Sequence, residues 1–267
     1  MNSIIRHEIK TGGKPFVLWT LGLAFLIMAG MYKFLGFNAE NGTDINVLFS
    51  QFPKIILAML GMANADIQTL SGYYAVLETY TLIVTAIFAI HLGANAVSRE
   101  MIDKTYEFVF TKPRTRIYIL GSKLGAGLAY LCLFSLFNLI FSFLAIRFVG
   151  FENTIRTAIY LYALNALLVG LIFFSLAAAL SALFNRAELG MRASNALFIL
   201  TYILSVLFDI TENPGLLKLL TPLRYFEAQD LLNGTLDLVY IIIALLLSMI
   251  FLCLSLRLFT KKDLKAV

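Results

Sequence analysis

Few residues in this sequence have the types and spacing that enzyme chemistry needs. His7 and Glu8 could begin a zinc-binding helix, but the second histidine of that motif is absent four residues later. The segments GGK at 12–14 and GSK at 121–123 lack the upstream glycine of a nucleotide-binding phosphate loop. No G-x-S-x-G nucleophile elbow occurs either. We therefore expect no catalytic residue, no metal site and no bound cofactor in this chain.

Polar side chains inside long apolar runs are the next candidates. Glu78, His91 and Asn138 each lie in or beside such a run, and His91 shares a helical face with Asn95. If these runs cross a membrane, an ionisable residue within them is a functional candidate. Uncharged polar groups in spans also hydrogen-bond neighbouring helices. A role in a transport pathway or gate and a role in helix association both remain open for these residues.

The segment 98–123, SREMIDKTYEFVFTKPRTRIYILGSK, is longer than a connector between packed helices requires. Glu100 and Lys104 have the i,i+4 spacing of a helical ion pair, while Ile102 and Tyr106 lie on a common apolar face. Pro113 disfavours helix at the residue before it. The pattern predicts a short amphipathic helix followed by a break and a basic cluster, which comprises Lys112, Arg114 and Arg116. Such a helix suits either an anionic lipid surface or a groove in a soluble partner.

The composition shows what must position these residues. Of the 267 residues, 60% are hydrophobic and 14% charged, and the mean hydropathy is +0.85. A soluble domain usually carries about 25% charged residues, so the apolar excess must face lipid. About 20 apolar residues cross a bilayer as a helix. We predict an all-α protein of the cell membrane, a single transmembrane domain 1–267 with six spans, at about 15–35, 74–98, 121–146, 157–185, 190–209 and 238–257.

Pro15 suits the first turn of the first predicted span. Within the third, Gly121, Gly125 and Ala129 repeat at helical spacing, which predicts close packing against another helix.

The basic residues indicate the orientation of these spans. With six spans, 15 of the 21 lysines and arginines fall on the side of the two termini and 6 on the other, as the positive-inside rule requires. We therefore predict cytoplasmic termini and attribute the net charge of +5 to topology, with no nucleic-acid partner. The apolar segment 45–63 is interrupted by Gln51, Pro53 and Lys54, and we predict that it does not span.

Two outer segments, 33–72 and 209–237, are too apolar for solvated loops. They predict short re-entrant or interfacial helices before the second and sixth spans. Tyr225 and Phe226 would suit the depth of the lipid headgroups, where aromatic rings are enriched. The second segment could be a lid over the helix ends or an element that gates a substrate.

The motif E-x-x-x-K-T-x-E-F-x-x-T-K-P-x-x-R, from Glu100 to Arg116, resembles the first cytoplasmic loop of type-2 ABC transporter permeases, the membrane subunits of ABC-type exporters. The outer segments 52–74 and 213–226 and the C-terminal FTKKDL at 259–264 resemble the same family. The sequence departs from many relatives at Lys104-Thr105, where they have Gly-Thr, and this could alter the local turn.

The resemblance implies that the loop is a coupling helix seated on a separate ABC-type ATPase subunit, which would hold the ATP and Mg²⁺. It also implies that two permease copies, identical or closely related, form the pathway, and that residues 6–14 form an amphipathic N-terminal helix. The resemblance and the apolar stripe together give the candidate coupling residues Glu100, Ile102, Thr105, Tyr106, Glu107, Lys112, Pro113 and Arg116.

The expected function is therefore ATP-driven export of an amphipathic or hydrophobic substrate by alternating access, with hydrolysis confined to the partner subunit. An ATPase-coupled complex for envelope remodelling or peptide sensing is an alternative. An independent secondary transporter is a weaker one, because it would require interrupted helices and ionisable residues at the midplane. Pathway or gate candidates are Glu78, His91, Asn138, Tyr225 and Phe226.

Overall fold

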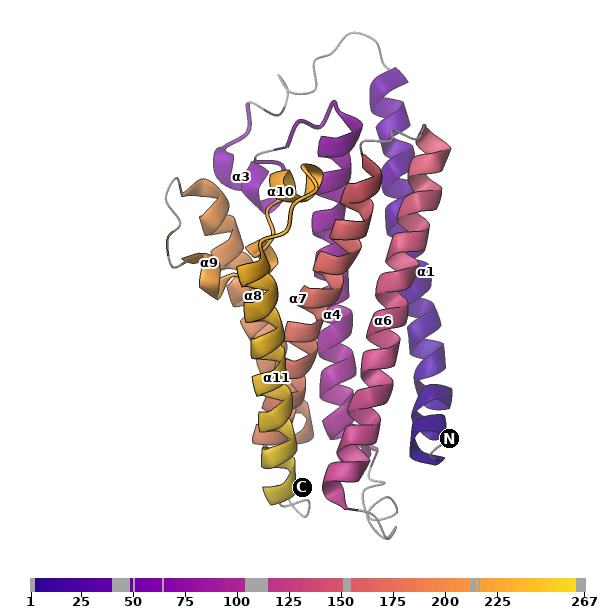
Figure 1. Cartoon of the computed structure of the whole chain (residues 1–267), viewed down its shortest axis with the longest axis vertical. Coiled ribbons are helices and arrows are strands. Elements are labelled where there is room, and N and C mark those ends of the chain that lie inside the picture. Colours follow the sequence, from indigo (N-terminus) through magenta and orange to yellow (C-terminus); the bar gives the residue numbers. More distant parts are fainter. Residues whose placement is uncertain are drawn as a thin grey trace.

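The computed structural model describes residues 3–39, 49, 51–63, 65–103, 115–150, 155–211, 215 and 217–262, and in these ranges it is all-α. Within them, six helices are long and apolar enough to cross a membrane, which confirms the predicted number. They run along the long axis of the molecule (Figure 1). The six are α1 (Ser3–Ala39), α4 (Leu70–Ile102), α6 (Arg116–Val149), α7 (Ile155–Leu183), α8 (Ala187–Ile210) and α11 (Leu238–Lys261).

Successive long helices run antiparallel to each other, so both ends of the described chain lie at one end of the bundle (Figure 1). We call this the terminal end. It contains the start of α1, the residues on either side of 104–114, the connection between α7 and α8, and the end of α11. The opposite end, which we call the lid end, carries the short helices.

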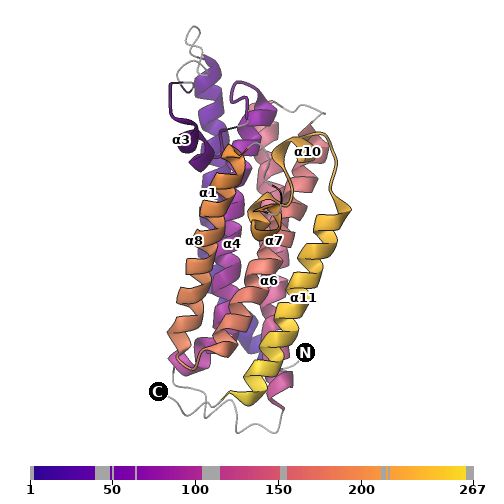
Figure 2. The same ribbon diagram turned by 90° about the vertical axis from the view of Figure 1, so that its left-hand side faces the viewer.

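The centre of the bundle is formed by α4 and α7, which pack extensively on each other. On one side α11 packs against α7, and on another α1 packs mainly against α6. The outer positions of α1, α8 and α11 are visible in the two perpendicular views (Figure 2). The buried face of α7 is rich in alanine and otherwise mainly apolar, as expected for a helix enclosed by others.

Side-chain caps explain why two helices begin earlier than predicted. The Thr69 hydroxyl accepts a hydrogen bond from the amide of Gly72 at 3.1 Å, and Thr115 caps α6 by accepting from the amide of Tyr118 at 3.3 Å. Such caps satisfy amides that lack a partner in the first helical turn. As a result α4 begins at Leu70 and α6 at Arg116, each more than one turn before the predicted start of its span, 74 and 121.

The N-terminal helix expected at 6–14 is the first part of α1, continuous with the span that follows. Pro15 therefore lies inside α1 and not in its first turn, contrary to the expectation. Proline lacks the amide that would donate to the carbonyl four residues earlier, and the helix continues through this missing bond.

Four short elements lie at the lid end: α3 (Lys54–Met59), α9 (Leu217–Leu220), the 3₁₀ turn η1 (Pro222–Arg224) and α10 (Ala228–Leu232). At six residues, α3 is far too short to cross a bilayer. The structure thus agrees with the prediction that the segment 45–63, as far as it is described, contains no seventh span.

Candidate functional site

The predicted coupling segment is only partly within the described chain. Glu100 and Ile102 occupy the last turn of α4, and Arg116 is the first residue of α6. Ile102 is 48% exposed and is thus available to a partner. The other five candidates lie outside the described residues, and their role stays a prediction: Thr105, Tyr106, Glu107, Lys112 and Pro113.

Glu100 faces into the bundle. Its carboxylate forms an ion pair with the ammonium group of Lys123 on α6, and a carboxylate oxygen of Glu8 on α1 lies 3.8 Å from the same nitrogen. The Lys123 side chain is only 4% exposed. One buried cation therefore joins three helices at the terminal end, immediately before the coupling segment. Sequence reasoning did not identify Lys123 as a site residue.

A second set of contacts holds the other flank of the segment. The Arg116 guanidinium donates to the carbonyl of Lys262, just after α11, at 2.8 Å. The Lys262 ammonium in turn donates to the carbonyl of Ser181 on α7 at 2.7 Å. Burial lowers the pKa of Lys262 to about 8. Residues 104–114 are thus bounded by two junctions, which together reach α1, α4, α6, α7 and the end of α11.

A cavity of about 300 Å³ lies beside the first junction, between α1, α4 and α6. Its walls include His91 and Asn95, which confirms that these residues share a face of α4, together with the rings of Phe16 and Phe88. The Tyr130 hydroxyl, also in the wall, donates to a backbone carbonyl of α1. The cavity is lined both by aromatic rings and by charged side chains of both signs.

Glu78 is buried inside the bundle. Because α4 begins at Leu70, Glu78 lies two turns inside this helix, and it is 3% exposed. The Thr81 hydroxyl donates to its carboxylate at 2.5 Å. The Ser142 hydroxyl of α6 lies 3.3 Å from that carboxylate and 3.2 Å from the Asn138 amide oxygen. These contacts link α4 to α6 and favour the interhelical role for Glu78 and Asn138.

The expected position of Tyr225 and Phe226 at headgroup depth stays a prediction, but both side chains are buried within the protein. They are 1% and 4% exposed. The Tyr225 hydroxyl donates to the carbonyl of Leu219 at 2.9 Å, and its ring lies 5.1 Å from that of Tyr240 on α11. The 3₁₀ turn at Pro222 folds the two rings inward. The segment is therefore packed against the start of α11, and both the lid and the gate interpretations of it stay predictions.

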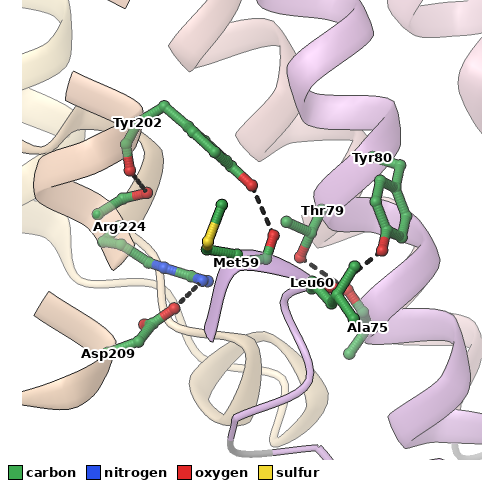
Figure 3. Close-up of polar contacts among 9 residues, drawn as sticks. Met59, Leu60, Ala75, Thr79, Tyr80, Tyr202, Asp209 and Arg224 are labelled. Atoms are coloured by element: carbon green, nitrogen blue, oxygen red, sulfur yellow. Dashed lines mark hydrogen bonds and ion pairs between the residues drawn. The ribbon is translucent and has the colours of Figure 1, made fainter. Parts of the chain in front are cut away.

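Two tyrosines attach α3 to the bundle (Figure 3). The Tyr202 hydroxyl of α8 donates to the carbonyl of Met59 at 2.6 Å, and the Tyr80 hydroxyl of α4 donates to that of Leu60 at 3.0 Å. Both acceptors are carbonyls at the end of α3, which have no partner within so short a helix. The lid-end segment is thereby held between α4 and α8.

An ion pair attaches the second lid-end segment. The Arg224 guanidinium contacts the carboxylate of Asp209 near the end of α8, and both side chains are largely buried. A further pair joins Lys218 to Glu227 at 2.7 Å. Asp209, Arg224 and Glu227 line a polar cavity of about 310 Å³, together with residues that follow α3 and the first residues of α10. The five candidates for the pathway or gate lie in three places: Glu78 with Asn138, His91 in the cavity beside Lys123, and the neighbours Tyr225 and Phe226. Of residues distant in the sequence, the structure brings only Glu78 and Asn138 together.

Comparison with known proteins identifies one family. The family model described as "ABC-2 family transporter protein" matches residues 2–264 of the chain. No curated protein matches the chain.

Proposed function

Because the chain belongs to the ABC-2 family of transporter proteins and is a membrane subunit of an ABC transporter, we propose that it exports an amphipathic or hydrophobic substrate. The family is a membrane component distinct from the ATPase, and it implies an ABC ATPase partner. On this proposal the partner binds ATP and Mg²⁺, and this chain converts the partner's motion into movement of its helices.

The two junctions beside residues 104–114 carry this proposal. A partner that moves the coupling segment displaces Glu100 and Arg116, the residues that flank it. Because Lys123 connects Glu100 to α1 and α6, and Arg116 holds the end of α11, the displacement reaches most of the bundle. Packed helices joined by buried polar contacts move as bodies and do not deform locally. This arrangement suits a subunit driven from its terminal end.

On this proposal the terminal end is cytoplasmic, as the distribution of lysine and arginine favours. Two copies, or this chain and a close relative, would pair to form the pathway between them. The substrate class follows from the apolar surfaces and from the cavity beside His91, whose aromatic rings and charged side chains suit an amphipathic molecule. Alternating access would then expose that pathway to each side in turn.

Transport in inside-out vesicles tests the proposal. The chain is co-expressed with its cognate ABC ATPase, and ATP-dependent accumulation is measured for fluorescent amphipathic peptides and a fluorescent phospholipid. Export predicts accumulation of at least one probe inside these vesicles, and none with a partner whose phosphate-loop lysine is replaced. Accumulation only in right-side-out vesicles would reverse the direction. ATP turnover without movement of any probe would contradict the substrate class.

A further inference from the structure

A cavity of about 420 Å³, larger than the two described above, lies between the lid-end halves of α1 and α4. Leu26 and Ala29 of α1 and Leu77 of α4 line it, together with Phe49 and Met62. Phe25 lines the cavity and is 76% exposed, so the cavity reaches the surface of a span. In a bilayer that surface is in contact with lipid chains.

The lining of this cavity is chemically simple. The Tyr73 hydroxyl donates a hydrogen bond to the carbonyl of Gly30 at 2.8 Å, and the Tyr80 hydroxyl donates one to the carbonyl of Leu60. Lys33 is the one charged residue among the described residues that line it. Lys33 is exposed and directly follows the uncharged run 15–32 of α1. A lysine at this position extends its ammonium group to the headgroup region.

These features define a ligand with an apolar chain and an anionic head. An apolar cavity does not hold water well, because water there lacks hydrogen-bond partners. A neighbouring acyl chain can enter from the side and fill the space, and Lys33 can pair with a phosphate or carboxylate at the level of the headgroups. The other two cavities differ, because charged residues of both signs line each of them.

We propose that this cavity is a binding site for an anionic phospholipid of the leaflet at the lid end, with an acyl chain between α1 and α4 and the headgroup at Lys33. The bound lipid fills the space beside Phe49 and Met62. The site requires membrane insertion only, so it does not depend on export or on the ATPase.

The single tryptophan, Trp19, makes a quenching experiment direct. In a Trp19→Phe background, Leu26→Trp places the only indole in the cavity wall, and Met62→Trp places it on the opposite side should the first variant fail to fold. The protein is reconstituted in phosphatidylcholine vesicles with increasing amounts of dibrominated phosphatidylglycerol or dibrominated phosphatidylcholine. We expect half-maximal quenching at a several-fold lower mole fraction of the anionic lipid.

Two controls make the result specific. Lys33→Gln should remove the preference for the anionic lipid and leave quenching by the neutral lipid unchanged. Leu246→Trp, at an exposed position on α11, should show no preference between the two lipids. Equal quenching by both lipids at Leu26→Trp and Met62→Trp would overturn the proposal, as would absence of quenching, which would indicate that a second copy occupies the cavity. ATP-dependent transfer of the brominated anionic lipid between leaflets would identify it as cargo and overturn its assignment as a resident lipid.

Discussion

A lysine at the beginning of a span usually sets membrane orientation, but the ammonium group of Lys123 is enclosed by the carboxylates of Glu8 and Glu100. Removing one partner from a buried ionic group leaves the remaining charges uncompensated. At this position the remaining charges would be two carboxylates of the same sign. The residue is thus a structural requirement of the terminal end as well as part of the charge asymmetry.

We predict that Lys123→Met lowers the free energy of unfolding by about 3–5 kcal/mol, the usual result of breaking a buried ion pair. Unfolding by sodium dodecyl sulfate in mixed micelles measures this change. Arg147→Met provides the control, because Arg147 is an exposed cation near the other end of the same helix. An equal loss of stability in both variants would show that the junction has no particular importance.

Lys262 gives a prediction of pH dependence. Burial lowers its pKa from 10.5 to about 8 in the folded chain, so between these values the unfolded chain binds more protons. Stability should therefore rise as pH increases from about 8 to about 10.5, and be independent of this group well below pH 8. Lys262→Met should lose that part of the rise, while Lys261→Met, at an exposed position, should retain it. Melting temperatures of the purified proteins across this pH range provide the comparison, and identical slopes in all three would contradict the prediction.

Residue-level sequence reasoning succeeded where a single helix decides the outcome. The common face of His91 and Asn95 follows from their i,i+4 spacing alone. The contact of Glu78 with Ser142 could not be predicted, because Ser142 lies on another helix, α6. The partners of Lys123 and Arg224 lie on other helices, and one sequence does not show which helices are neighbours.

At the scale of elements, the sequence likewise did not show which glycines lie where two helices meet. Gly121 and Gly125 were expected to allow close packing, yet a methyl group added at either would meet nothing within 4 Å in this chain. The close approach occurs at Gly93, where a Cβ atom would lie 2.1 Å from the carbonyl oxygen of Phe174 on α7. The same spacing is present on several faces of a helix, and only the arrangement of the bundle determines which face meets a neighbour.

The lid-end segment yields a prediction with a matched control on the same helix. Asp209→Ala leaves the largely buried Arg224 without its counter-charge, so we expect a loss of several kcal/mol, toward the range of about 3–5 kcal/mol for buried pairs. Glu188→Ala breaks the exposed pair with Arg192, where both side chains are more than half exposed, and should cost at most about 1 kcal/mol. Unfolding in mixed micelles measures both. Similar values for the two variants would mean that the ion pair does not hold the lid-end segment.

The coupling segment can be tested as an element. We predict that Ile102→Ala combined with Tyr106→Ala weakens binding of the ATPase, because burial of a large apolar side chain contributes about 1.5–3 kcal/mol. Glu107→Arg should also uncouple the subunits, since it reverses a charge between Lys104 and Lys112. Neither change lies in the apolar part of a span, so membrane insertion should be normal. Affinity capture of the ATPase and substrate-stimulated ATP turnover measure the effect.

Arg114→Gln separates the two interpretations of this segment. If the segment rests on anionic lipid, Arg114→Gln should impair function, and the double alanine variant should still capture the ATPase. If it seats on the ATPase, the reverse should hold. Normal capture and normal stimulation in both the double alanine and Glu107→Arg variants would exclude a coupling role.

At the scale of the whole molecule, the six spanning helices could be predicted because lipid imposes one dominant requirement: each crossing needs a long apolar run. The interruptions at Pro53 and Lys54 likewise indicated correctly that the segment around α3 is too short to cross. The attachment of the lid end could not be derived in this way, since it depends on contacts such as that between Tyr202 and Met59, which are 143 residues apart.

An even number of crossings places both termini on one side of the membrane and the lid end on the other. The excess of basic residues at the terminal end predicts that this side is the cytoplasm. The test uses a background in which Cys132 and Cys253, the only two cysteines, are replaced by serine. In intact cells, a membrane-impermeant maleimide should label Asn233→Cys, which lies on an exposed turn after α10. It should label Asp263→Cys only after the cells are permeabilised. Labelling of Asp263→Cys from outside, with Asn233→Cys protected, would invert the orientation and place the coupling segment out of reach of a cytoplasmic ATPase.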